Sequence, residues 1–232
     1  WQKVQSYLRA TKVFGKRYQA GVNPLYALEV TAITEFAWHQ LYLQNMLIND
    51  TAESYADHAK WTLVSLPNMK LDPEVDAVHS ESAVFIDITN KRIILCGLRF
   101  PGEMKKALFS VQSYLLPVRG VLPMHCAVTK ARSDATTLVL GVPATGKTTL
   151  SSATSRSLLG DDEHGWSMDA VFNLEDGCDT RCLHVCESDD PVLWQASKDS
   201  RAILMNVMVD NGIADYADAS LSRNARACYP RS

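Results

Sequence analysis

The chain has 232 residues, a length that allows one large domain or parts of two. Apolar residues make up 47% and charged residues 21%, which is ordinary for a globular protein that buries a core. The net charge of −3 provides no positive field for nucleic acid or anionic lipid, so neither is expected as a partner. No apolar run reaches the roughly 18 residues of a membrane span, and the opening residues lack the apolar stretch of a signal peptide. A soluble, cytoplasmic, enzyme-like chain is therefore predicted.

The six cysteines are scattered, and only Cys178, Cys182 and Cys186 cluster, at intervals of four residues. That spacing differs from the C-x2-C of a zinc site, so buried or idle thiols in a reducing compartment are the better interpretation. The chain begins at Trp1 without an initiator methionine and ends at Ser232 without a terminal signal, which indicates a fragment.

Strand and helix patterns alternate along the first half of the chain. Strands are predicted over residues 28–33, 61–66, 83–88 and 92–96. The turn at Asn90-Lys91 predicts a hairpin of the last two strands. Helices are predicted over residues 34–49, with Thr34 as N-cap, and over residues 103–116, closed by Pro117.

Residues 120–123 resemble a connector, and the character of the sequence changes there. A strand is then predicted over 136–140, followed by a glycine-bearing loop, a short helix from Lys147, and a strand over 157–159 that ends in two aspartates. Strand, loop, helix and strand with acids at the strand end is the layout of a nucleotide site. A domain boundary is therefore placed near residue 120, between 1–120 and 121–232.

Residues 141–148, GVPATGKT, match the phosphate-binding pattern G-x-x-x-x-G-K-[ST]. Its glycines let the backbone curl so that successive N–H groups point at a phosphate, and the following helix adds its positive end. Lys147 would reach the β- and γ-phosphates, and the Thr148 hydroxyl would ligate Mg²⁺. The predicted strand before the motif and helix after it are the context that such a site requires, so phosphate binding is predicted.

Three further features have both a structural and a functional interpretation. The run DDEH at 161–164 is a solvated acidic turn when taken alone, but close behind a phosphate loop it favours a role at Mg²⁺ or Mn²⁺. His125, after an apolar run, is by itself more typical of a satisfied core histidine. Lys105 and Lys106 by themselves are typical of an exposed pair on a helix.

Several segments together resemble the ATP-dependent phosphoenolpyruvate carboxykinases across essentially the whole chain. They are GEMKK at 102–106, YLLP at 114–117, MHC at 124–126, TGKTTLS at 145–151, LGDDEHGW at 159–166, and residues 224–230. GEMKK and GDDEHGW are far more specific to that family than the phosphate loop. The resemblance implies an α/β fold, with the later part of an N-terminal domain followed by the early part of a P-loop-containing C-terminal domain with a mixed sheet. The active site would lie between the two domains.

The resemblance also implies the reaction of oxaloacetate and ATP to phosphoenolpyruvate, ADP and CO₂, by a monomer that uses Mn²⁺ and Mg²⁺. Residues implied in catalysis are Lys106, His125, Lys147, Asp161 and Arg226. Ligands of Mn²⁺ would be Lys106, His125 and Asp162, with Thr148 on the nucleotide-bound Mg²⁺. The nucleotide would contact Gly141, Val142, Pro143, Ala144, Thr145, Gly146, Lys147, Thr148, Thr149, Arg181, Asp190 and Arg226. Substrate would contact Phe100 and Lys106.

The chemistry accounts for this gathering of cations. Loss of CO₂ leaves an enolate whose oxygen attacks the γ-phosphate, so negative charge accumulates on the enolate and on the phosphoryl oxygens together. A lysine can ligate a metal only after it loses its proton. For Lys106, a neighbouring cation and partial burial would favour that loss.

Some positions depart from the family pattern. Phe100 stands where a substrate-contacting tyrosine is expected, and Pro143 and Ala144 replace a serine and a glycine of the loop. Asp176 replaces a glycine, and Arg181 replaces a phosphate-contacting lysine. The early substrate-binding arginine and the later adenine clamp of the family have no counterpart in these residues. A nucleotide-binding relative without catalysis, and a P-loop kinase of related core, are the alternatives.

Overall fold

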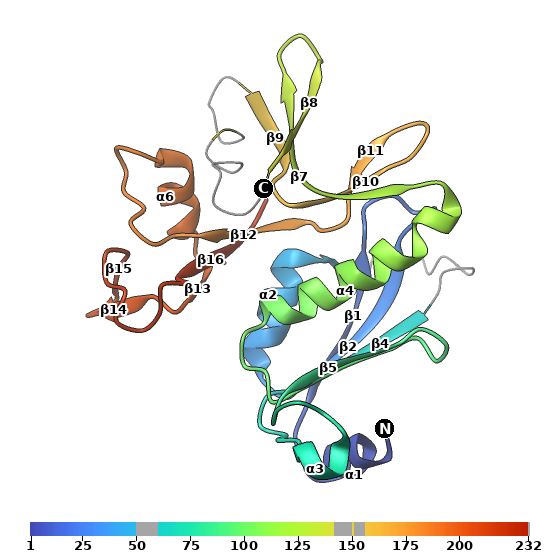
Figure 1. The fold of residues 1–232 in the computed structure, drawn as a ribbon. Coiled ribbons are helices and arrows are strands. Elements are labelled where there is room, and N and C mark those ends of the chain that lie inside the picture. The colour runs from blue at the N-terminus through green and yellow to red at the C-terminus, as the bar shows by residue number, and fades with distance from the viewer. Residues whose placement is uncertain (50–59, 142–149, 151–155, 232) are drawn as a thin grey trace. The chain divides into compact units, whose positions relative to one another are not determined.

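The computed structural model describes residues 1–49, 60–141, 150 and 156–231 (Figure 1). It divides into two compact units, which we call unit 1 (Trp1–Val121) and unit 2 (Leu122–Ser232). The assignment of these units to two carboxykinase domains remains a prediction. In the described part of the chain, no helix is long and apolar enough to cross a membrane.

Unit 1 is built on a six-stranded mixed sheet with the strand order β3-β1-β2-β4-β6-β5. Strands β2, β4 and β6 run parallel to one another, and β1, β3 and β5 pair antiparallel with their neighbours. In chain order its elements are α1 (Gln2–Ala10), β1 (Phe14–Ala20), β2 (Leu28–Thr34), α2 (Ala37–Met46), β3 (Ile48–Asn49), β4 (Lys60–Leu66), α3 (Pro73–Asp76), β5 (Ala83–Asp87), β6 (Arg92–Cys96), α4 (Gly102–Leu115) and the 3-10 helix η1 (Pro117–Arg119).

Helices cover both faces of this sheet. Successive side chains of β4 point to opposite faces. Val64 packs in one cluster with Val4 of α1, whereas the hydroxyl of Ser65 lies 3.3 Å from Nδ1 of His39 on α2. A parallel strand covered on both faces reads as a continuous apolar run, which is the pattern that β4 has.

The predicted elements of unit 1 are largely confirmed. All four predicted strands form, and β5 pairs with β6 as the predicted hairpin. Helix α4 begins at Gly102 and ends at Leu115, within one residue of its predicted bounds. Gly120, with φ of +73°, follows η1 in a left-handed conformation that suits glycine.

The predicted start of α2 at Thr34 is wrong. Thr34 stays in β2, and its Oγ1 donates a hydrogen bond to the carbonyl oxygen of Phe36 at 3.0 Å. Phe36 is therefore the N-cap, and it makes no side-chain capping bond. The helix also ends before Asn49, because Ile48 and Asn49 pair with β1. Sheet pairing at both ends shortens the helix that its apolar periodicity predicts.

Unit 2 consists of a five-stranded, a three-stranded and a two-stranded sheet, and its described strand pairs are all antiparallel. Its elements are β7 (Leu122–Ala131), β8 (Thr136–Leu140), β9 (Arg156–Gly160), β10 (Glu163–Trp166), β11 (Val171–Asn173), β12 (Gly177–Arg181), α6 (Pro191–Ser197), β13 (Ile203–Met205), β14 (Met208–Asp210), β15 (Ile213–Asp215) and β16 (Arg226–Pro230). The mixed sheet expected for the second domain is thus not present in these described pairs, because short connections such as those between β7 and β8 permit only antiparallel neighbours.

Two predictions for unit 2 have different outcomes. The strands predicted over 136–140 and 157–159 form as β8 and β9. The connector predicted over 120–123 is wrong in its second half, since Leu122 and Pro123 pair with β10 as the first residues of β7. The helix predicted from Lys147 lies outside the described residues.

A buried histidine fixes the turn between β9 and β10. Both strands pair with β7, and the two residues between them form the turn. His164 is 1% exposed, and its Nδ1 lies 2.9 Å from the carbonyl oxygen of Cys126 on β7. Burial lowers the pKa of His164 to about 4. The ring is therefore neutral at neutral pH, with Nδ1 as the donor to Cys126.

Gly160 makes room for this ring. A Cβ atom at residue 160 would lie 2.6 Å from Nε2 of His164 and 2.8 Å from Oδ1 of Asn173. Real Cβ atoms essentially never approach heavy atoms this closely. The glycine of the GDDEH run is therefore explained by the imidazole four residues later.

We predict that Gly160→Ala lowers the free energy of unfolding by about 1–3 kcal/mol, the usual cost of overpacking a filled interior. Gly15→Ala is the matched control, because a Cβ there meets its nearest neighbour only at 4.0 Å. Urea unfolding followed by circular dichroism measures both changes. Equal stability of the two variants would contradict the packing described for His164.

Candidate functional site

His125 and Asp162 meet at the turn between β9 and β10. Nε2 of His125 lies 2.5 Å from Oδ1 of Asp162. The side chain of His125 is 51% exposed and that of Asp162 is 22% exposed, so both are accessible from solvent. The backbone places them, because the N–H of Cys126 donates to the carbonyl oxygen of Asp162 at 2.7 Å. Two predicted metal ligands, 37 residues apart in sequence, are thus neighbours within unit 2.

This pair fits part of a Mn²⁺ site. An imidazole nitrogen and a carboxylate oxygen are donors that such a metal accepts. Among the described residues, no group of three or more His, Cys, Asp and Glu side chains is placed to hold a metal ion. His125 and Asp162 would therefore provide two of the donors, and the remaining ones must be of another kind.

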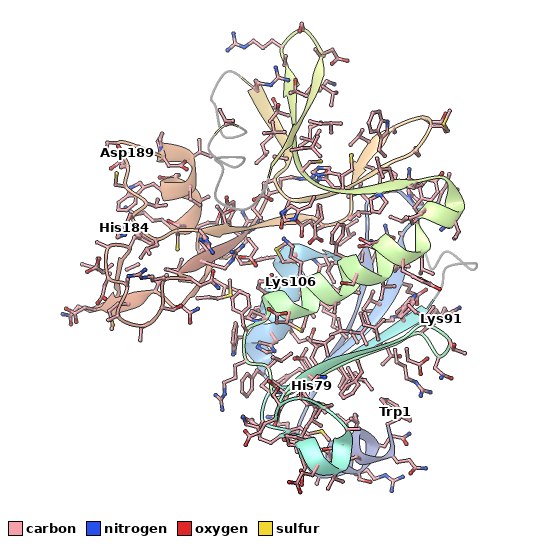
Figure 2. The ribbon with its side chains drawn as sticks, viewed as in Figure 1. Trp1, His79, Lys91, Lys106, His184 and Asp189 are labelled. Atoms are coloured by element: carbon pink, nitrogen blue, oxygen red, sulfur yellow. The ribbon has the colours of Figure 1, made fainter. Side chains whose placement is uncertain are left out.

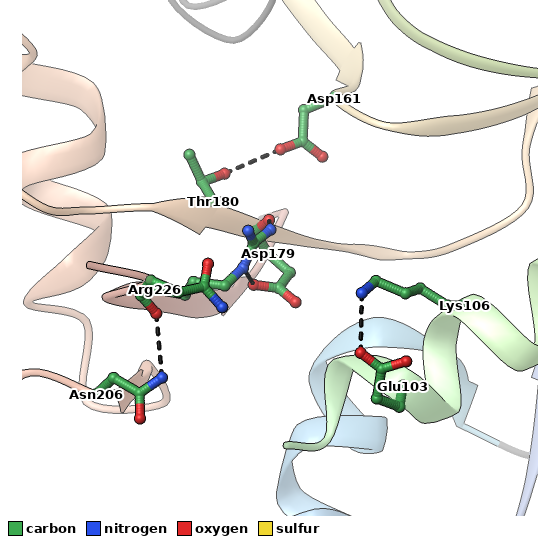
Figure 3. A network of polar contacts seen from close by, with 8 residues as sticks. Glu103, Lys106, Asp161, Asp179, Thr180, Asn206 and Arg226 are labelled. Carbon is green, nitrogen blue, oxygen red and sulfur yellow. Dashed lines mark hydrogen bonds and ion pairs between the residues drawn. The ribbon is translucent and has the colours of Figure 1, made fainter. Parts of the chain in front are cut away.

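Lys106, the third predicted ligand, belongs to unit 1. It projects from α4 with its side chain 63% exposed, and its Nζ lies 2.9 Å from Oε1 of Glu103 (Figures 2 and 3). Its neighbour Lys105 is 7% exposed, so the two lysines are not an exposed pair. The partial burial expected to help Lys106 lose its proton is not provided by unit 1 itself.

Phe100 lies just before α4. A Cβ on Gly102 would be 2.4 Å from Cε1 of Phe100, so the ring rests directly against the first turn of the helix. Phe100 is half-buried there. Its ring has no hydroxyl and cannot donate the hydrogen bond that a tyrosine at this position would make.

A polar network that we did not predict supports the segment that carries Phe100. Glu35, Asn68 and Arg99 follow the carboxyl ends of β2, β4 and β6, respectively. Nδ2 of Asn68 donates to Oε1 of Glu35 at 3.0 Å, and Nη2 of Arg99 donates to Oδ1 of Asn68 at 3.1 Å. The carboxyl edge of parallel strands is where α/β proteins place ligand-contacting groups. Parallel pairing of β2, β4 and β6 is the signal that would have revealed this network.

Asp161 faces the opposite direction from Asp162. It is 6% exposed, and Oγ1 of Thr180 on β12 donates to its Oδ2 at 3.0 Å (Figure 3). Neighbouring residues of an extended segment point to opposite sides, which explains the divergence. The structure therefore gives the two aspartates different surroundings, one beside His125 and one beside β12.

Arg181 and Arg226 are directly opposite each other in the register of β12 and β16. Arg226 is held by Asp179: Nε donates to Oδ1 at 2.7 Å and Nη2 donates to the backbone oxygen at 2.5 Å (Figure 3). The side chains of Asp179 and Arg226 are 3% and 22% exposed. The structure thus brings two predicted phosphate contacts together, and adds a carboxylate that sequence analysis missed.

The remaining predicted site residues have other surroundings. Asp190 is the N-cap of α6, where its Oδ1 accepts a hydrogen bond from the N–H of Leu193 at 3.1 Å. Gly141 is exposed at the end of β8. The other predicted nucleotide contacts, residues 142–149 with Lys147 and Thr148, lie outside the described residues.

Two further sequence features are settled by local contacts. Asp176, which departs from the family pattern, pairs with Nη2 of Arg231 at 3.1 Å. Cys178, Cys182 and Cys186 are free thiols, and the first two are buried. Burial raises the pKa of Cys182 to about 11, so this thiol stays protonated at neutral pH.

The described cavity of unit 1 is separate from these groups. It has a volume of about 310 Å³ and lies among α1, β5 and β6, with Val4, Phe85 and Ile94 in its lining. It shares no lining residue with the predicted site.

Comparison with known proteins assigns the chain to a family. A family model for phosphoenolpyruvate carboxykinase matches residues 1–232. Phosphoenolpyruvate carboxykinase (ATP) of Shouchella clausii is 42% identical, over 98% of this chain and 44% of that protein. The enzymes of the same name from Geobacillus thermodenitrificans and Deinococcus radiodurans are 39% and 36% identical, over 99% and 98% of this chain and 44% and 49% of those proteins. The chain spans less than half the length of these relatives. It belongs to the ATP-dependent phosphoenolpyruvate carboxykinase family.

Proposed function

We propose that this chain is the phosphate- and metal-binding part of an enzyme that converts oxaloacetate and ATP into phosphoenolpyruvate, ADP and CO₂. The observation that carries the proposal is the turn between β9 and β10. In the segment most specific to the family, this turn sets Asp162 beside His125. The activity is proposed for the whole protein, because the chain covers only 44–49% of the relatives above.

The metal groups of the proposal are His125 and Asp162 in unit 2 and Lys106 in unit 1. When bound, Mn²⁺ and Mg²⁺ would stabilise negative charge on the enolate and on the phosphoryl oxygens. His125 and Asp162 would hold Mn²⁺ through Nε2 and a carboxylate oxygen, and both would then give up their contact with each other. Lys106 would have to leave Glu103 and lose its proton before its Nζ could act as a ligand.

The phosphate groups of the proposal are Lys147, Thr148 and Arg226. Lys147 and the backbone N–H groups of the loop would bind the β- and γ-phosphates of ATP, and Thr148 would hold Mg²⁺. Arg226 would contact the transferred phosphoryl group, whose charge a guanidinium fork matches. Arg181, opposite Arg226, would add a second guanidinium on the same face.

Nucleotide binding without turnover is the second candidate. Two observations favour it: Lys106 is paired with Glu103, and Arg226 is paired with Asp179. Phe100 adds to it, since its ring lacks the hydroxyl expected at that position. Both candidates share the phosphate loop, and they differ in whether oxaloacetate is decarboxylated.

The first prediction of the proposal concerns Lys147. Lys147→Ala should weaken binding of a fluorescent ATP analogue by roughly 1.5–3 kcal/mol, because a charge-assisted bond to phosphate is lost. Lys130→Ala is the control, since Lys130 lies on β7 and pairs with Asp134. Unchanged affinity of the Lys147 variant would refute the proposed nucleotide site.

The second prediction concerns Mn²⁺. His125→Ala should weaken Mn²⁺ binding measured by water-proton relaxation, and binding to the unchanged chain should fall at low pH as the ligands take up protons. His79→Ala is the control, because His79 is exposed in unit 1 (Figure 2). If both variants give the titration curve of the unchanged chain, His125 is not a ligand.

The third prediction is that the 232-residue chain by itself forms no appreciable phosphoenolpyruvate. The substrate arginine and the adenine clamp of the family are not among its residues, so neither reactant would be held in a near-attack geometry. A coupled assay with oxaloacetate, ATP and Mn²⁺ tests this, on protein whose ATP-analogue binding has been verified. Sustained joint formation of ADP and phosphoenolpyruvate would show the prediction to be wrong.

A further inference from the structure

The register of β12 and β16 creates an electrostatic conflict. Arg181 and Arg226 are paired directly, so their side chains leave the same face of the sheet. Like charges in directly opposite positions destabilise an antiparallel pair. Arg181 is exposed to solvent, whereas the Arg226 side chain is only 22% exposed and loses most of the screening that water provides. A counter-charge on this face would relieve the conflict.

Asp179 is on the correct face to provide that charge. It precedes Arg181 by two residues of β12, and residues two apart in a strand share a face. Its side chain is 3% exposed and contacts Nε of Arg226 at 2.7 Å. The backbone oxygen of the same residue accepts a second bond from Nη2 of Arg226. Two bonds from one residue fix both the position and the orientation of the guanidinium group.

The carboxylate also reduces the charge that an anion would meet. Two guanidinium groups and one carboxylate have a net charge of one positive unit, and the carboxylate is too buried to be screened by salt. An anion that approaches Arg226 is therefore attracted by the guanidinium and repelled by Asp179. The site is held in shape by the same group that weakens its attraction for negative charge.

We propose that Asp179 is a positioning residue and internal counter-ion of an oligophosphate subsite formed by Arg181 and Arg226. The proposal rests on the proposed function, which supplies the nucleotide phosphates as the ligand. Planar guanidinium groups match phosphate oxygens, so the ligand class is a di- or triphosphate chain. By limiting affinity for the resting phosphate, Asp179 reserves part of the arginine charge for the transition state, where phosphoryl charge is redistributed.

Calorimetric titration with inorganic tripolyphosphate at low ionic strength tests this subsite in the 232-residue chain. Asp179→Asn keeps an oxygen acceptor for Nε of Arg226 and removes the negative charge. It should bind tripolyphosphate about three- to tenfold more tightly than the unchanged chain, from the Coulomb energy of one charge at the distance of a neighbouring side chain. The gain should shrink as salt is added, which a purely structural effect would not do.

The matched control is Asp199→Asn. Asp199 also pairs with an arginine, Arg201, at 3.0 Å, and this replacement removes the same charge from unit 2. It should leave tripolyphosphate affinity unchanged. Arg181→Gln, at an exposed position that tolerates replacement, should weaken binding and gives a second test if Asp179→Asn fails to fold.

The outcomes separate the inference from the proposed function. No binding of tripolyphosphate to the unchanged chain, or no effect of Lys147→Ala on it, would overturn both. If Lys147→Ala weakens binding while Asp179→Asn binds no more tightly than the unchanged chain, only the role of Asp179 is overturned. An unchanged affinity of Arg181→Gln would likewise overturn the two-arginine subsite alone.

Discussion

The hydrogen bond between the buried imidazole of His164 and the carbonyl oxygen of Cys126 is the constraint on which the candidate site of unit 2 depends. Cys126 is bound to this turn twice, because its N–H also donates to the carbonyl oxygen of Asp162. Both bonds join β7 to the residues between β9 and β10, and Gly160 leaves the space in which the ring lies. His125 and Asp162 are therefore placed by backbone contacts next to them rather than by their own attraction. A site built in this way keeps its shape when its charged side chains exchange partners.

β12 connects this turn to the arginine pair through alternate faces of one strand. Thr180 points one way and bonds to Asp161, whereas Asp179 points the other way and bonds to Arg226. Groups that the resemblance assigns to different parts of one reaction thus depend on a single five-residue strand. Both aspartates are almost fully buried, and a buried carboxylate is tolerated only with hydrogen-bond partners. The partners of these carboxylates are therefore part of what stabilises unit 2, as well as part of the candidate site.

Local patterns in the sequence predicted much of unit 1 and less of unit 2. Helix α4 was found within one residue because Pro117 marks its end locally, and the hairpin of β5 and β6 because a turn separates two short apolar runs. The start of β7 was missed because Pro123 is unusual inside a strand. Family motifs named His125 and Asp162 correctly as neighbours of the turn, but the approach of Asp179 to Arg226 depends on pairing across 47 residues. No local pattern encodes such a register, and the capping role of Asp190 was overlooked although proline follows it.

The paired state of the charged groups changes what a motif implies about affinity. A motif counts the cations that could meet a phosphate, whereas binding measures the difference between the new contacts and those given up. Arg226 has to be neutralised in unit 2 before any ligand arrives, because an unpaired and largely buried charge would cost several kcal/mol. A phosphate that takes over this arginine leaves Asp179 buried with a weakened partner. The ligand must therefore share Arg226 with the carboxylate, and only an anion with more charge than the resting phosphate gains the full strength of the guanidinium group. The requirement that unit 2 be stable without ligand is thus also what makes its arginine pair selective for charge that develops during a reaction.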